Sequence, residues 1–366
     1  MKKVIFISAI ALAAAVSCTK SEVVDTKFNE QIGFETYLGR DAQTKASVAT
    51  AIETAGIYGF YTGNDQWKST SAANLWANDP LTAAGTVTPT KYWTNATDWY
   101  SFVAYAPKDG TGITVPTKAE GADYITNPAI TFAVQPDLAN QVDFLYAKTL
   151  DVHKPAENGT VPMIFKHALA RLTVNAKSAE NQTFAFRVKK VSINGGFITS
   201  DVLTLATGLW TAAGTPVAPT TPGTEATENT PATLPVYATT YTFYNNADNT
   251  TALGTTNTEY AKVGDNYSNY LMMVPVNFTQ QAAYLTVEYT TYYANQESTV
   301  NTVSFPVNTN FEQGKAYAIN LVFSKETQEI KFTVSVEDWQ PTTTTGEGDD
   351  ATTTTDEIDN DKNIAA

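Results

Sequence analysis

The sequence predicts an all-β protein built from two antiparallel β-sandwich domains in tandem. Short runs of alternating apolar and polar residues recur along the chain, and Gly, Pro, Asn and Asp separate them. Val, Thr and Tyr, which suit a pleated and half-buried surface, are abundant, and no long stretch keeps the 3.6-residue period of a helix. The length of 366 residues is enough for about two domains.

The first 17 residues have the pattern of a signal peptide. Lys2 and Lys3 precede a short apolar run, which is too short to span a bilayer as a helix. Ser17 followed by Cys18, the only cysteine, resembles the lipobox of bacterial lipoproteins. That resemblance implies cleavage before Cys18, acylation of this residue and attachment to the outer membrane through its lipid. The alternative is an ordinary signal peptide next to a cysteine with no role.

Residues 18–45 form the expected propeptide, which contains the first strand. Ile32, Phe34, Thr36 and Leu38 share one face of an alternating run, with polar residues and Gly between them. Turn-type residues then end the run, and a polar, basic joint follows over residues 39–46. The pattern predicts a strand with one buried face and an exposed segment after it.

The two sandwiches are expected at residues 46–166 and 167–340, because a short apolar run ends near Lys166 and a new alternating series begins after it. In the first domain we expect strands over residues 56–61, 99–105, 141–147 and 161–165, and a turn of helix over 71–77. In the second we expect strands over residues 169–176, 184–193, 241–244, 270–276, 284–293, 300–307, 317–323 and 330–336.

Two irregular features interrupt the second domain, and a separate tail follows it. The alternation slips at Lys189 and Lys190, as a β-bulge would make it do. Residues 211–235 are rich in Thr, Pro, Ala and Gly and predict a long exposed loop. Residues 341–366 form a Thr-rich and acidic tail, which is either disordered or a β-prone segment that needs a partner.

Charge and residue content argue against several classes of function. A net charge of −14 argues against nucleic acid as a partner, because phosphate binding needs an excess of Lys and Arg. The only histidines, His153 and His167, have no spaced partners for a metal site or a catalytic triad, so we expect no enzyme and no cofactor. Carboxylates of the tail, among them Asp356, Asp359 and Asp361, are typical of a solvated segment rather than a Ca²⁺ site.

Taken together, the motifs resemble those of the fimbrillin family of Bacteroidetes, the pilin subunits and associated proteins of lipoprotein-derived pili. Four features carry the resemblance and cover nearly the whole chain. They are the lipobox at Cys18 with the Ile32-x-Phe34 strand and Thr44-Lys45-Ala46, the run 141–147 (QVDFLYA), the run 165–174 (FKHALARLTV), and Gly314 to Tyr317 with the final Val336 to Trp339.

The resemblance implies two transthyretin-like β-sandwiches and a defined route of assembly. The precursor reaches the outer membrane as a lipoprotein, and a trypsin-like protease cuts it after a basic residue that follows the first strand. The strand that carries Ile32, Phe34 and Leu38 then leaves, and a strand of a neighbouring pilin subunit fills the groove. The implied product is an extracellular fimbria, a polymer of this subunit with accessory subunits, that acts in adhesion to a host or bacterial receptor.

The chain itself favours Arg40 as the cut site. Arg171 and Arg187, the other two arginines, lie in predicted strands, where backbone hydrogen bonds block a protease. Arg40 lies in the polar joint, the kind of segment that proteases nick, and Lys45 is the second choice. The alternative is that Arg40 is a solvated loop charge. The family's polymerising subunits donate a C-terminal strand, and the acidic tail here leaves both a stalk and a tip subunit open.

A surface glycan-binding lipoprotein is the competing hypothesis. Aromatic residues are dense in the first domain and could form platforms for sugars, although large aromatic side chains more often fill a core. The residues concerned are Trp67, Trp76, Tyr92, Trp93, Trp99 and Tyr100.

Overall fold

The computed structural model describes most of the chain between residues 30 and 339. The described ranges are 30–38, 52–156, 159–179, 185–212, 214–224, 233–245, 260–263, 270–279, 282–293, 296–324 and 330–339. The predictions for Cys18, Arg40 and Lys45 and for the tail 341–366 lie outside these ranges. Strands dominate the described part, as predicted for an all-β protein. Within it, no helix has the length and apolar character needed to cross a membrane.

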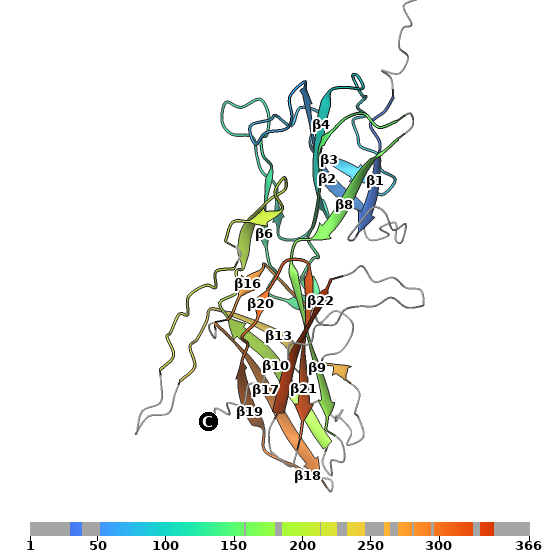
Figure 1. Cartoon of the computed structure of the whole chain (residues 1–366). Coiled ribbons are helices and arrows are strands. Elements are labelled where there is room, and N and C mark those ends of the chain that lie inside the picture. Colours follow the sequence, from blue (N-terminus) through green and yellow to red (C-terminus); the bar gives the residue numbers. More distant parts are fainter. Residues whose placement is uncertain are drawn as a thin grey trace, which may run out of the picture.

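The N-terminal part contains a six-stranded sheet (Figure 1). Its order is β1-β8-β7-β4-β2-β3, so the first strand of the chain stands at one end of it. The strands are β1 (Phe34–Leu38), β2 (Thr54–Gly63), β3 (Trp76–Thr82), β4 (Trp99–Ala106), β7 (Leu145–Val152) and β8 (Val161–His167).

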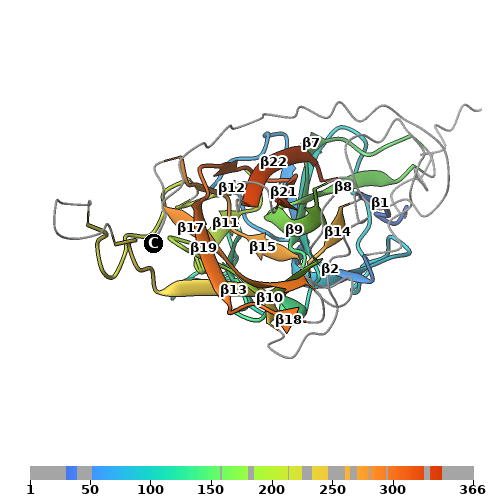
Figure 2. The ribbon, with the colours of Figure 1, turned by 90° about the horizontal axis from the view of Figure 1, so that it is seen from below.

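The C-terminal part contains two five-stranded sheets, which Figure 2 shows from below with β9, β21 and β22 on one side and β10, β13 and β18 on the other. One sheet comprises β10 (Ala185–Gly195), β13 (Thr239–Asn245), β17 (Ala283–Tyr293), β18 (Gln296–Glu297) and β19 (Asn301–Pro306). The other comprises β9 (Ala170–Ser178), β14 (Ala261–Lys262), β15 (Leu271–Met273), β21 (Lys315–Phe323) and β22 (Ile330–Asp338).

Smaller sheets complete the fold. A four-stranded sheet joins β5 (Ile113–Thr114) and β6 (Ala129–Ala133) to β11 (Ser200–Thr204) and β12 (Leu209–Trp210). Because β6 pairs with β11, this sheet crosses the predicted boundary between residues 166 and 167, which stays a prediction. A two-stranded sheet pairs β16 (Val276–Asn277) with β20 (Asn310–Phe311), and a 3₁₀ turn, η2, spans Leu138–Asn140.

Strand pairing is mostly antiparallel, with two parallel exceptions that join strands far apart in sequence. β1 pairs with β8 in parallel, and β9 pairs with β21 in parallel. The predicted bulge is confirmed, since the register of β10 against β17 shifts between Val188 and Lys190. The predicted helical turn over residues 71–77 is wrong: β3 begins at Trp76 and continues through Pro80. A proline is tolerated there because β3 lies at the end of the sheet order.

Among the described residues, buried apolar side chains form two clusters. The smaller cluster is formed by side chains of the six-stranded sheet and of the segments beside it, and it includes Ile32, Phe34, Trp76 and Phe102. The larger one begins with Tyr58 and Phe60 of the N-terminal part, continues through the four-stranded sheet, and fills the C-terminal sandwich. The first strand of the chain therefore belongs entirely to the smaller core.

Candidate functional site: the first strand and its groove

The segment from residue 30 to residue 38 has one buried face and one face turned to solvent. Ile32, Phe34 and Thr36 are buried, with exposed fractions of 1 %, 4 % and 6 %, and Leu38 is partly buried. Glu35 on the other face is exposed. This confirms the alternation that the sequence predicted, and it places the three residues of the predicted removable strand in the core cluster or against it.

This segment is hydrogen-bonded on both sides. On one side Phe34 to Leu38 pair in parallel with Val161 to Phe165 of β8. On the other side its first half meets the chain that follows β3. The bonds there run from Ile32 N to Lys91 O (2.9 Å), from Phe34 N to Gly85 O (3.0 Å) and from Trp93 N to Glu30 O (3.1 Å). Since β8 and β3 lie toward opposite ends of the sheet order, the segment closes the gap between them.

Aromatic rings form the floor beneath the segment. The ring of Phe34 meets Trp76 edge-on at 5.7 Å and Phe102 at 5.1 Å between centroids. Trp93 in turn packs edge-on against Tyr100 at 4.6 Å. Edge-to-face pairs of this kind add to the free energy that burial alone provides. Loss of Phe34 would leave Trp76 and Phe102 facing an apolar slot.

Gly85 lets the neighbouring chain approach the strand closely. Its φ of +75° lies in the left-handed region, and a Cβ atom there would lie 1.8 Å from the carbonyl oxygen of Phe34. A larger residue at this position would force the two segments apart. The glycine therefore permits the hydrogen bond that holds Phe34 on this side.

An ion pair fixes the beginning of the strand. Lys154 Nζ lies 2.6 Å from Glu30 Oε2, and the two side chains are 9 % and 20 % exposed. Lys154 follows β7, so the pair ties residue 30 to the core of the sheet. The ion pair, the backbone hydrogen bonds and the burial of Ile32 thus all hold this end of the segment in place.

Three of the six aromatic residues considered as sugar platforms lie in the core. Trp76, Trp93 and Tyr100 are at most 2 % exposed, which matches the expectation that large aromatics fill a core. Trp67 is partly buried and packs against Phe60. Only Tyr92, at 50 % exposure, stands out from the surface, while Trp99 is covered in part by the ring of His153 at 3.7 Å. No continuous platform of these six residues is formed.

The two arginines outside the joint lie in the C-terminal part of the chain. Arg171 lies in β9 and Arg187 in β10, which confirms that both are in strands. Arg187 stacks on Tyr292 at 4.1 Å, and Arg171 lies over Trp339 at 5.0 Å. No group of three or more metal-binding side chains occurs among the described residues.

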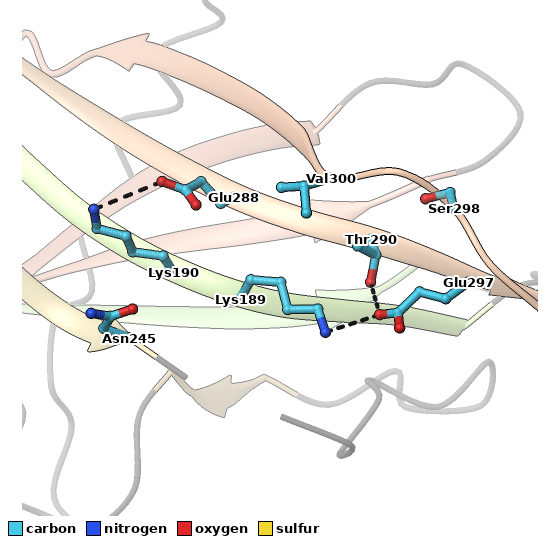
Figure 3. A pocket seen from close by; sticks show the side chains of 8 residues that line it. All are labelled: Lys189, Lys190, Asn245, Glu288, Thr290, Glu297, Ser298 and Val300. Atoms are coloured by element: carbon cyan, nitrogen blue, oxygen red, sulfur yellow. Dashed lines mark hydrogen bonds and ion pairs between the residues drawn. The ribbon is translucent and has the colours of Figure 1, made fainter. Parts of the chain in front are cut away.

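A hollow on the C-terminal sandwich is lined by charges that satisfy one another (Figure 3). The bulge in β10 brings Lys189 to Glu297 at 3.0 Å and Lys190 to Glu288 at 3.8 Å. Hydrogen bonds from Thr290 and then Lys189 lower the pKa of Glu297. These pairs account for the charged side chains of the lining, two lysines and two glutamates, so the hollow contains no surplus of charge that would select a ligand.

Comparison with models of protein families identifies one family. The model of the Fimbrillin-like family matches residues 44–339. The chain belongs to the Fimbrillin-like family. This places it among structural proteins of fimbriae, and it agrees with the prediction that the chain is not an enzyme. The matched span begins after β1 and ends at Trp339.

A solved structure shares the fold. A fimbrial protein from Bacteroides vulgatus superposes with a TM-score of 0.55 at 19 % identity, over 85 % of this chain and 100 % of its own. A candidate cell adhesion protein from Bacteroides uniformis gives a TM-score of 0.46 at 17 % identity, over 85 % and 99 %. A second such protein, from Bacteroides ovatus, gives 0.47 at 15 % identity, over 86 % and 99 %. No curated protein sequence matches the chain.

Proposed function

We propose that this chain is a pilin-like subunit of a cell-surface fimbria that acts in adhesion and assembles by strand exchange. In this proposal Cys18 carries the lipid of an outer-membrane precursor, and cleavage after Arg40 or Lys45 separates β1 from the rest of the subunit. A strand of a neighbouring subunit then takes the place of β1. Membership of the Fimbrillin-like family supports the fimbrial role, and the geometry of β1 supports the exchange.

The placement of β1 is the observation that carries the proposal. The segment 30–38 covers a separate apolar cluster, and it comes before the first residue of the family match. Burying Ile32 and Phe34 contributes about 1.5–3 kcal/mol each. An uncovered groove would also present the free edge of β8, which favours pairing with another strand. The stabilising free energy that is lost when β1 leaves is therefore regained when another strand binds in its place.

Limited trypsin treatment of the full-length protein tests the proposal. We expect a nick after residue 40 or 45, followed by oligomers that resist SDS. The variant Arg40→Ala with Lys45→Ala should stay uncut and monomeric, whereas Arg187→Ala, in a strand, should behave like the unaltered protein. Polymerisation of the double variant would refute cleavage at the joint.

The glycan-binding alternative finds less support in the geometry. Sugar platforms need exposed aromatic faces, and Trp76 and Trp93 are buried. Retention of the soluble protein on a polysaccharide affinity gel would revive this alternative.

A further inference from the structure

A pocket lies directly beyond the end of β1. Its volume is about 540 Å³, and its lining includes Tyr146, Phe165, His167, Leu209 and Trp339. Leu38, the last residue of β1, pairs with Phe165, and Phe165 lines the pocket. Phe165 thus borders both β1 and this space.

The edge of β8 extends past β1 into the pocket. The ladder with β1 ends at Phe165, whereas β8 continues through Lys166 to His167. Both of these residues line the pocket, and on the far side they pair with Tyr146 and Leu145 of β7. Within the described part of the chain, this two-residue overhang has strand pairing on one side only. It offers a short template for the end of another strand.

The chemistry of the pocket suits a side chain that is mainly apolar and carries one hydroxyl or amide group. His167 is 7 % exposed, its ring stacks on Trp339 at 4.0 Å, and Nδ1 lies 2.9 Å from a carboxylate oxygen of Asp143. Because a carboxylate only accepts, Nδ1 donates to Asp143, and Nε2 is the ring nitrogen left for another group. That Nε2 is buried and has no partner among the described residues. Leu209, at 66 % exposure, provides apolar surface at the pocket.

The two ends of the segment are held unequally. At its beginning, three backbone hydrogen bonds to the chain after β3 and the Glu30–Lys154 pair add to the ladder with β8. At its end, Leu38 is only partly buried and lies next to the open pocket. An exchange that begins at Leu38 therefore breaks few contacts at first, whereas one that begins at Ile32 breaks the strongest contacts first.

We infer that this pocket is the entry site at which a strand of a neighbouring subunit first binds, before it displaces β1 from the Leu38 end toward Glu30. This inference rests on the proposed strand exchange. The incoming strand pairs with the overhang at Lys166 and His167 and places a hydroxyl- or amide-bearing side chain against His167 Nε2. It then replaces β1 residue by residue, so that the apolar core is never fully uncovered.

Peptide displacement in the trypsin-nicked full-length protein tests the entry site. The probes are two labelled peptides of residues 30–40, one with Arg40→Tyr and one with Arg40→Gly. The alternation of Ile32, Phe34 and Leu38 predicts that position 40 of a bound peptide has the same phase, so the tyrosine should reach toward the pocket and the glycine should leave it empty. We expect the tyrosine peptide to replace β1 at least about tenfold faster, as measured by fluorescence anisotropy.

Variants of the protein separate the pocket from the groove. Leu209→Trp, which fills the pocket, should reduce the rate for the tyrosine peptide to that of the glycine peptide, whereas Val300→Trp, at another exposed position, should not. His167→Phe should slow the replacement of β1 by the tyrosine peptide but not by a peptide with Arg40→Phe. The reason is that only the tyrosine hydroxyl can form a hydrogen bond with His167 Nε2.

The outcomes distinguish the two proposals. Displacement at equal rates by the tyrosine and glycine peptides would overturn the entry site and leave strand exchange intact. No displacement by either peptide, even in large excess, would overturn strand exchange and the entry site with it.

Discussion

Replacing Phe34 by alanine should destabilise the uncut protein strongly and the assembled subunit not at all. In the uncut chain Phe34 is 4 % exposed and touches the rings of Trp76 and Phe102. Truncating a buried phenylalanine to alanine costs about 3–5 kcal/mol. In a fimbria from which β1 has left, residue 34 is no longer part of the subunit, so the same substitution cannot affect it.

Urea unfolding followed by tryptophan fluorescence measures the first half of this prediction, because Trp76 and Trp93 lie in the core that Phe34 covers. Tyr37→Ala is the matched control, since it lies on the same strand but on the opposite face. We expect a loss of about 3–5 kcal/mol for Phe34→Ala and less than about 1 kcal/mol for Tyr37→Ala. Equal effects of the two variants would refute the assignment of the buried face.

Three further predictions concern the same domain. Lys154→Ala should speed the dissociation of a labelled 30–38 peptide from the nicked protein about tenfold or more, because the ion pair with Glu30 is lost. The control Lys331→Ala, on the exposed face of β22, should leave the dissociation rate unchanged. Equal rates for the two variants would contradict a role for the ion pair. Hydrogen bonds, chiefly from Tyr61 and next from Asn95, lower the pKa of Asp98 below its ordinary value of 3.8. The Asp98 carboxylate therefore contributes fully to the stability of the fold above about pH 4, and this contribution is lost as the pH falls through the lowered pKa. Acid unfolding of Asp98→Asn should therefore be less steep in this range than that of the unaltered protein, and an identical pH profile would count against the Tyr61 contact. Trp93→Ala should cost about 3–5 kcal/mol in a urea titration, since Trp93 is 1 % exposed, and a stable variant that only loses polysaccharide binding would favour the glycan alternative.

Side-chain periodicity made the strands and the buried face of the site predictable. Ile32, Phe34 and Leu38 alternate with polar neighbours, and the structure turns the first two into the core as the period of two requires. The bulge at Lys189 and Lys190 could be located for the same reason, because one inserted residue reverses the phase of the alternation.

The same alternation cannot predict which strands pair with each other. Alternation shows which face of β1 is buried, but it carries no information that β8, more than 120 residues later, lies beside it in parallel. The pairing of β6 with β11 across the predicted domain boundary was hidden for the same reason. The edge strand β3 accommodates Asn78, Asp79 and Pro80, with Asn78 at a φ of +71°, and alternation does not predict such a strand.

The entry pocket shows a further limit of sequence reasoning. Its lining comes from β7, β8, the β11–β12 connection with the start of β12, the start of β21 and the end of β22, which meet only in three dimensions. In the sequence His167 has no spaced partner, but in the structure its Nδ1 is paired with Asp143, whereas Nε2 has no partner among the described residues. A single sequence cannot show which nitrogen of a histidine remains unpaired.

Intact-mass analysis of subunits from fimbriae sheared off intact cells shows whether the first strand has left the mature subunit. We expect mature subunits that begin at Asp41 or Ala46 and lack Ile32, Phe34 and Leu38. Fimbriae made of subunits that retain residues 18–38 would contradict this expectation, because the groove would then still be filled by the subunit's own first strand.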